Sequence, residues 1–167
     1  IEKGDTLPFF EGFESELFPP QKWILNESGS IFTWMLDPEV KKTGNSSIFL
    51  FNTILLMNNI NYSEDLLSPV LDLTSAEKPA LTFDVAYNYH LYTPPYFTQN
   101  LVLADTLSIF ISEDCGETYS LIYKKGGADL ATAAEPITNP LELEQCMFIP
   151  TDEQWRTEKI DLSDYRN

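Results

Sequence analysis

Residues 107–112 have the sequence Leu-Ser-Ile-Phe-Ile-Ser, and this stretch decides the fold class. Side chains alternate between the two faces of a β-strand, so Leu107, Ile109 and Ile111 share one face. Phe110 is the apolar exception on the opposite face. The stretch therefore predicts a strand with one apolar face turned toward a core.

Other segments carry similar signals. Runs rich in Ile, Leu, Phe, Val and Tyr, bounded by Gly, Asn, Pro or Asp, predict strands at 47–56, 80–89, 106–112 and 119–123. Residues 155–162 alternate more weakly and predict an edge or rim strand, while 87–99 and 126–139 have the composition of loops. The best helical candidate, 140–145, is too short to stand alone. The chain is therefore expected to be all-β.

The size and composition of the chain indicate one domain. It has 167 residues, of which 43% are hydrophobic and 13% are aromatic. This is enough apolar surface to form a core without metals or many disulfides. We expect residues 1–167 to form a single β-sandwich.

The negative charge of the chain limits its partners. There are 26 acidic and 10 basic residues, and the formal charge is −16. Such a surface repels phosphate backbones and anionic lipid headgroups, so neither nucleic acid binding nor membrane insertion is expected. No apolar run approaches the roughly 20 residues of a membrane span. Calcium would be attracted because it takes oxygen ligands, although solubility outside a cell also explains the acidity.

Several phrases occur in a fixed order along the whole chain. They are Phe-Glu-Gly-Phe-Glu at 10–14, Phe-Pro-Pro at 18–20, Trp23, Trp34, Thr-Gly-Asn-Ser-Ser at 43–47, and the stretches 65–73, 79–87, 105–119, 148–150 and 155–163. This ordered set resembles the choice-of-anchor J or cleaved-adhesin module, a relative of MAM domains found in secreted bacterial proteins. The resemblance implies a jelly-roll sandwich, of the concanavalin or galactose-binding kind, that is secreted or held at the cell surface.

One departure from the family pattern concerns the end of the chain. Family members usually continue past the strand at 155–162 into two more strands, whereas this chain ends at Asn167. We therefore expect a domain truncated at its C-terminal end, with the final strands missing. A sandwich without them would expose unpaired strand edges.

The resemblance also implies a calcium site. In related modules a Glu of the opening phrase meets acidic residues of the final strand around a metal, and Glu14 is the matching position. Asn45 could add an oxygen ligand from the Gly44–Asn45 turn. The alternatives are a solvated or turn-capping carboxylate at Glu14 and a simple tight turn at Asn45.

A tyrosine-rich loop is the candidate ligand-binding surface. It contains Tyr89, His90, Tyr92 and Tyr96. Exposed tyrosines stack on sugar rings or apolar side chains while their hydroxyls bind polar groups. Alternatively, these rings fold back as a cover over the sandwich. His90 is the only histidine, so a His-based zinc site is excluded.

The remaining candidates are a turn or cation loop at residues 114–118 and a disulfide between the two cysteines. Asp and Gly between two strands are typical of a hairpin turn, although Asp114 and Glu117 could also form a cation loop. Cys115 and Cys146 are too few for a disulfide scaffold or a zinc site. They could form one disulfide in an oxidising compartment.

The common catalytic motifs are missing from the sequence. It has no His-Glu-x-x-His helix, no Gly-x-Ser-x-Gly elbow and no phosphate-binding glycine loop, so no enzyme is expected. The expected function is a non-catalytic adhesion or binding module of a larger secreted protein. It would bind extracellular carbohydrate or protein, with calcium as a stabilising ion, beside neighbouring domains of its parent. The alternatives are a structural spacer appended to a secreted metalloprotease, and a hydrolase.

Overall fold

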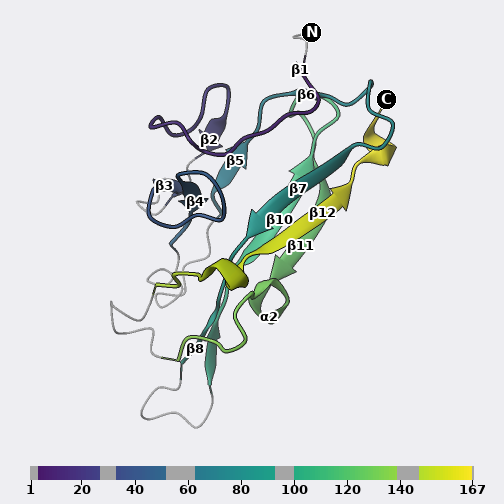
Figure 1. The fold of residues 1–167 in the computed structure, drawn as a ribbon. Coiled ribbons are helices and arrows are strands. Elements are labelled where there is room, and N and C mark those ends of the chain that lie inside the picture. Colours follow the sequence, from purple (N-terminus) through teal and green to yellow (C-terminus); the bar gives the residue numbers. More distant parts are fainter. Residues whose placement is uncertain (1–3, 27–32, 52–62, 93–99, 139–146, 167) are drawn as a thin grey trace.

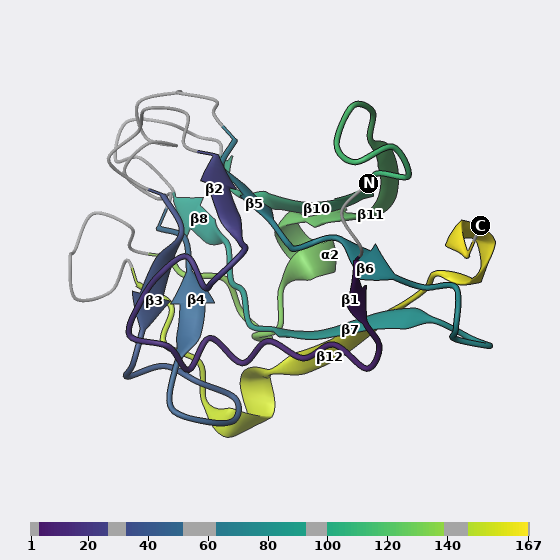
Figure 2. The same ribbon diagram turned by 90° about the horizontal axis from the view of Figure 1, so that it is seen from above.

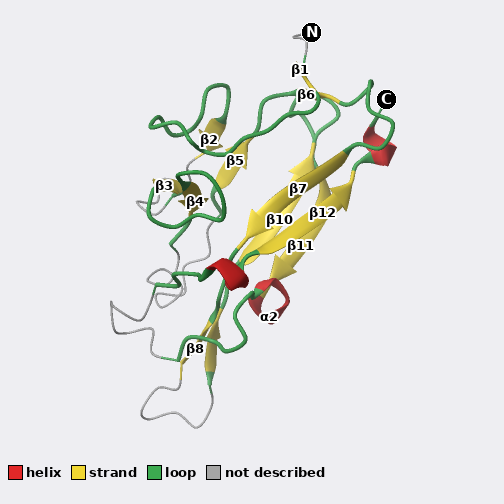
Figure 3. Ribbon diagram, viewed as in Figure 1, coloured by secondary structure: helices red, strands yellow, loops and turns green. Residues whose placement is uncertain are grey.

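The computed structural model describes residues 4–26, 33–51, 63–92, 100–138 and 147–166 (Figure 1). Strands dominate these ranges, as Figure 3 shows, and the all-β expectation is confirmed at that level. Helical structure in the described ranges consists of three short turns, α2 (Gly127–Leu130), η1 (Asp152–Gln154) and η2 (Ser163–Tyr165). None of these turns has the length and apolarity needed to cross a membrane.

Two antiparallel ladders form the main body of the molecule. β7 (Ala80–Val85) pairs with β12 (Arg156–Asp161), and β10 (Thr106–Ile111) pairs with β11 (Ser120–Gly126). Seen from above, the ladders lie on opposite sides of the molecule (Figure 2). The rings of Phe83 and Tyr123 meet edge to face between them, with centroids 5.5 Å apart. The ladders are therefore two layers with apolar faces turned toward each other.

The two-residue period assigns the faces of the β7–β12 ladder. Phe83 is paired with Glu158 on the inner face, and Asp84 is paired with Thr157 on the outer face. Burial alternates with the same period along both strands. The weak alternation at 155–162 thus predicted a true strand, with a polar outer face.

A half-buried ion-pair cluster joins the two layers. Lys125 Nζ on β11 lies 2.7 Å from Glu158 Oε1 on β12, and Arg156 Nε donates to the same oxygen at 2.8 Å. The hydrogen bond from Lys125, followed by that from Arg156, lowers the pKa of Glu158. The Arg156 guanidinium also donates to the carbonyls of Leu130 and Ala131, where α2 ends. The cluster therefore holds α2 against β12.

The other strands are short and form small sheets. β1 (Asp5–Thr6) pairs in parallel with β6 (Leu71–Asp72), and the antiparallel pairs are β2 (Ile24–Asn26) with β5 (Asp65–Leu67), β3 (Met35–Asp37) with β4 (Ser47–Phe49), and β8 (His90–Tyr92) with β9 (Leu101–Leu103). Each sheet in the described ranges has two strands and does not close. The jelly-roll topology therefore stays a prediction.

The core of the described structure is thin. Its buried apolar side chains are Leu103, Leu130 and Leu162. Many large apolar side chains are instead exposed: Phe10, Leu17, Ile24, Val70, Leu101, Val102, Phe110, Tyr119, Leu121, Met147 and Ile149. Phe110, the exception in the alternating stretch, is paired with Leu121, and both side chains are slightly more than half exposed. Exposed apolar groups that gather in one place are candidates for partner contacts.

Several predicted boundaries differ from the structure. The strand predicted at 80–89 ends at Val85, and β8 forms at 90–92, inside a predicted loop. The loop predicted at 126–139 contains α2, and the strand predicted at 119–123 extends to Gly126. Of the strand predicted at 47–56, β4 covers 47–49, and residues 52–56 lie outside the described ranges. The helical candidate at 140–145 lies outside them as well.

Candidate functional site

Glu14 and Asn45, the two expected metal ligands, lie in direct contact. The backbone N–H of Asn45 donates to both carboxylate oxygens, with N···O distances of 3.1 and 2.9 Å. The Asn45 side-chain amide donates to Glu14 Oε2 at 2.8 Å. Gly44 has a φ of +70°, and a Cβ there would lie 1.9 Å from Glu14 Oε1. We call Glu14, Gly44 and Asn45 the Glu14 clasp.

The chain on both sides of the Glu14 clasp is also held. Phe13 has a positive φ of 57°, and its N–H donates to Glu11 Oε1 at 2.6 Å. The hydroxyl of the buried Ser46 donates to the Phe13 carbonyl. The Phe13 ring meets the Trp23 ring edge to face at 5.6 Å. These contacts bring residues 10–14 and 44–46 together, although they are about 30 residues apart in sequence.

The Glu14 clasp, as it stands, does not form a calcium shell. Calcium takes six to eight oxygen ligands, whereas the carboxylate here accepts N–H groups from Asn45. Calcium would require the Asn45 amide to turn its oxygen toward Glu14. Within the described ranges, no three His, Cys, Asp or Glu side chains gather closely enough to hold a metal. The arrangement is that of a carboxylate capping a turn, and the metal role stays a prediction.

The tyrosine-rich segment is partly built into the fold. Tyr87 accepts the Asp105 N–H on its hydroxyl at 2.7 Å, and burial raises the pKa of Tyr87 to about 12. The Tyr89 carbonyl accepts the Ile137 N–H at 3.0 Å, and β8 pairs with β9. The segment up to Tyr92 therefore lies against residues 131–137 and β9.

The predicted ligand-contacting residues differ in their accessibility. His90 is 6% exposed and offers almost no surface to a ligand. Tyr89 and Tyr92 are half-buried, so part of each ring remains accessible. Tyr96 lies outside the described residues. Binding by these tyrosines stays a prediction, and the observed packing matches their alternative role as a cover.

The stretch 114–118 forms the hairpin turn between β10 and β11. Asp114 Oδ1 accepts the Thr118 N–H and the Ser112 hydroxyl, both at 2.8 Å, and Oδ2 accepts the Thr118 hydroxyl at 2.5 Å. These hydrogen bonds, those from Thr118 first, lower the pKa of Asp114 to about 2. Gly116 supplies a φ of +93°. The carboxylate is thus used to hold the turn, as the hairpin interpretation expects.

Cys115 lies at the tip of the same turn, with a positive φ of 60°. It is an exposed, free cysteine in this structure. Cys146 lies outside the described residues. The disulfide between Cys115 and Cys146 therefore stays a prediction.

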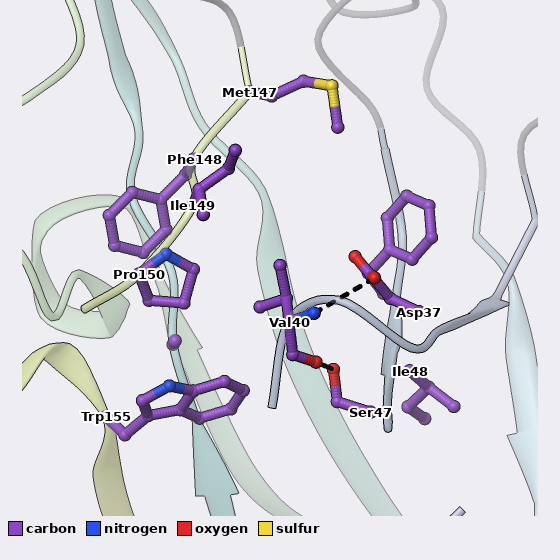
Figure 4. Close-up of a pocket in the computed structure, with 11 residues that line it drawn as sticks. Asp37, Val40, Ser47, Ile48, Met147, Phe148, Ile149, Pro150 and Trp155 are labelled. Carbon is purple, nitrogen blue, oxygen red and sulfur yellow. Dashed lines mark hydrogen bonds between the residues drawn. The ribbon is translucent and has the colours of Figure 1, made fainter. Parts of the chain in front are cut away.

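A small apolar pocket, which the sequence did not indicate, lies beside the outer face of the β7–β12 ladder (Figure 4). Its volume is about 90 Å³. We call it the Trp155 pocket. The described residues that line it are Asp37, Val40, Ser47, Ile48, Phe49, Ala86, Met147, Phe148, Ile149, Pro150 and Trp155. Nine of these eleven residues are apolar, so the pocket is suited to an apolar group.

Backbone geometry and the two-residue period place the Trp155 pocket. Trp155 is extended, with φ −95° and ψ 137°, and precedes β12, so it shares a face with Thr157. Ala86 follows β7 and shares a face with Asp84 by the same rule. Both faces are the outer ones. The hairpin of β3 and β4 and residues 147–150 supply the remaining walls.

The polar groups that line the pocket bond within the fold. Asp37 Oδ1 accepts the N–H groups of Glu39 and Val40, at 2.8 and 3.1 Å. The Ser47 hydroxyl donates to the Val40 carbonyl at 2.5 Å. These bonds shape the loop between β3 and β4, and they occupy Asp37 Oδ1 and the Ser47 proton.

Sequence reasoning missed the pocket because its walls come from four separate parts of the chain. The only local signals are Trp155 and the run Met-Phe-Ile-Pro at 147–150. Comparison of the chain with protein-family models, curated proteins and solved structures gives no match. A function for the chain therefore has to be inferred from the geometry of the described residues.

Proposed function

We propose that this chain is a non-catalytic binding module that acts outside the cell and holds a protein partner. The observation that supports it is the Trp155 pocket, an accessible apolar concavity on the outside of a strand ladder. Met147 and Ile149 on its lining are about half and two-thirds exposed. Large apolar side chains around a concavity are typical of sites that receive a partner's side chain.

Binding explains the pocket better than catalysis does. A hydrolase needs an acid, a base or a nucleophile that can reach the substrate. Among the described residues that line the pocket there is one carboxylate, Asp37, whose Oδ1 already accepts two backbone N–H groups. The hydroxyl of Ser47, the one in the described lining, donates to the Val40 carbonyl rather than to a base.

A protein partner suits the pocket better than a carbohydrate partner. A sugar ring presents hydroxyl groups, which need polar partners placed around the ring. Asp37 Oδ1 and the Ser47 hydroxyl proton are used inside the fold, and the other described lining residues have apolar side chains. An apolar side chain of a protein makes no such demand. Carbohydrate binding remains the competing outcome of the experiment below.

Calcium is proposed as a stabilising ion on the strength of the family resemblance at Glu14. The ion would be held by Glu14 and by the Asn45 amide oxygen after the amide has turned. No binding step is assigned to it, because the Trp155 pocket forms without it. A calcium titration that follows the melting temperature of the chain tests whether the ion binds.

The proposal is tested on arrays of extracellular matrix proteins and glycans, using the whole chain and two exposed-residue variants. Ile149→Ser alters the pocket lining at a side chain that is 69% exposed. Ile24→Ser is the control, because Ile24 on β2 is similarly exposed, at 61%, and does not line the pocket. We expect protein binding that Ile149→Ser weakens and Ile24→Ser leaves unchanged. Equal binding by all three chains would place the contact elsewhere, and uniform silence would remove the binding function.

A structural spacer is the second candidate, and the outer face of the β10–β11 ladder favours it. Phe110 and Leu121 are a cross-strand pair on that face, and both are slightly more than half exposed. A neighbouring domain of the parent protein could cover this pair. Phe110→Ser in the parent protein, with thermal unfolding of the adjacent domain as readout, checks this role. An unchanged neighbour argues against a spacer.

A further inference from the structure

We infer that the Trp155 pocket takes one short branched aliphatic side chain, such as leucine, from a basic segment of a protein partner. This inference rests on the proposed binding function and adds the chemistry of the occupant. The size of the pocket limits which side chain of the partner can enter, and the charge around the pocket determines which residues can flank that side chain.

The volume of the pocket limits what can enter it. A cavity of about 150 Å³ lined by aliphatic and aromatic side chains holds one benzene molecule, and one liquid water occupies about 30 Å³. The Trp155 pocket, at about 90 Å³, has room for a group of about three or four heavy atoms. The side chains of valine, leucine and isoleucine fit this limit. An aromatic ring or a whole sugar ring exceeds it.

The lining also favours an aliphatic group. The indole of Trp155 and the ring of Pro150 lie on one side, and Val40 and Ile48 lie on the other (Figure 4). Met147 and Ile149 line the pocket and are themselves exposed, so a side chain that enters would cover part of their surface. Each buried methylene stabilises such a contact by favourable transfer out of water.

The charges around the pocket favour a basic partner. The two main segments that build it, residues 37–49 and 147–155, carry four carboxylates, those of Asp37, Glu39, Asp152 and Glu153. The same segments carry two exposed lysines, Lys41 and Lys42, which donate to the carbonyls of Pro38 and Asp152. The guanidinium of Arg156 bonds Glu158 and the end of α2 on the inner face. The neighbourhood is therefore net negative, as is the chain at −16.

The test uses the whole chain and short synthetic peptides, observed by nuclear magnetic resonance of the indole N–H groups. The chain has three tryptophans, Trp23, Trp34 and Trp155, so a contact at the pocket gives a signal that the other two control. The probe is a capped peptide with one leucine between two pairs of Lys and Arg. Its comparators replace the leucine by alanine or by phenylalanine, or replace the flanking bases by Glu and Asp.

We expect the leucine peptide to shift the Trp155 signal in a saturable way. The alanine peptide should bind about tenfold or more weakly, because three carbons are no longer buried. The phenylalanine peptide should also bind more weakly, and the acidic peptide should not bind. High salt should weaken the binding of the leucine peptide, because screening reduces the attraction between its basic residues and the acidic surface of the chain. Ile149→Ser should weaken binding about fivefold, whereas Ile24→Ser should leave it unchanged.

Three results would overturn the inference: an unmoved Trp155 signal, equal binding of the leucine and alanine peptides, or equal binding of the basic and acidic peptides. Its failure can be distinguished from failure of the proposed function. If sugars shift Trp155 and peptides do not, the module binds carbohydrate and the binding function survives. If neither shifts Trp155 and the protein and glycan arrays are also silent, the binding function fails as well.

Discussion

Replacing Gly44 by alanine tests the geometry of the Glu14 clasp. The φ of +70° at Gly44 strains an L-residue by about 1–2 kcal/mol. The new Cβ would also lie 1.9 Å from Glu14 Oε1, so the carboxylate must move and lose its N–H partners on Asn45. At an exposed site these bonds are together worth about 1–2 kcal/mol. We therefore expect Gly44→Ala to lower the free energy of unfolding by about 2–4 kcal/mol.

Urea unfolding followed by tryptophan fluorescence measures this loss, and a double-mutant cycle with Glu14→Ala separates its parts. Without the Glu14 carboxylate, Gly44→Ala should cost only the backbone strain of about 1–2 kcal/mol. Gly116→Ala is the matched control, because its φ is +93° and its Cβ would first meet the Tyr119 hydroxyl, at 3.0 Å. An equal cost of Gly44→Ala with and without Glu14 would refute the clasp as a stabilising contact.

Three further predictions concern the turn, the ion-pair cluster and calcium. The pKa of Asp114, about 2, is below the ordinary value of about 3.9, so its stabilisation is complete above that value and is lost as pH falls toward 2. Between these two pH values, the melting temperature of Asp114→Asn should fall less steeply with pH than that of the unchanged chain. An identical slope in both chains would contradict the role of Asp114 in the turn. Glu158→Gln should lower the free energy of unfolding in urea by about 1–2 kcal/mol. This value includes a discount for solvent screening, because Lys125 and Arg156 are partly exposed. The control Glu117→Gln should leave the free energy of unfolding almost unchanged. Calcium at millimolar levels should raise the melting temperature if Glu14 binds it, and Glu14→Gln should abolish the rise. A flat titration of the unchanged chain would remove the ion.

The strands were predictable where one apolar face repeats every second residue. Residues 107–112 show this pattern and form most of β10. The pattern even marked Phe110, whose exposed side chain lies beyond a register shift that starts after Ile109. Strand β8 was missed because His90, Leu91 and Tyr92 stand among loop-forming residues. It forms through long-range pairing with β9 and a bridge to Ile137, which local sequence does not show.

One part of the candidate site followed from the calcium hypothesis, which grouped two residues that are distant in sequence. The calcium hypothesis grouped Glu14 with Asn45, and the structure brings them into hydrogen-bond contact. It could not specify that the Asn45 N–H groups would face the carboxylate, because that depends on the backbone around Gly44. The local sequence marks only Trp155 and residues 147–150 of the Trp155 pocket, since a concavity assembled from four segments is a property of tertiary packing.

The Glu14 clasp and the Trp155 pocket share one loop, which gives the clasp a consequence for binding. The loop of residues 37–47 supplies Asp37, Val40 and Ser47 to the pocket lining, and Glu14 holds the same loop at 44–45. Loosening the clasp should free one wall of the pocket, and ordering that wall again on binding costs free energy. We therefore expect Gly44→Ala to lower the affinity for the leucine peptide about fivefold, and Gly116→Ala to leave this affinity unchanged. Equal affinity of the two variants would mean that the clasp contributes to stability alone.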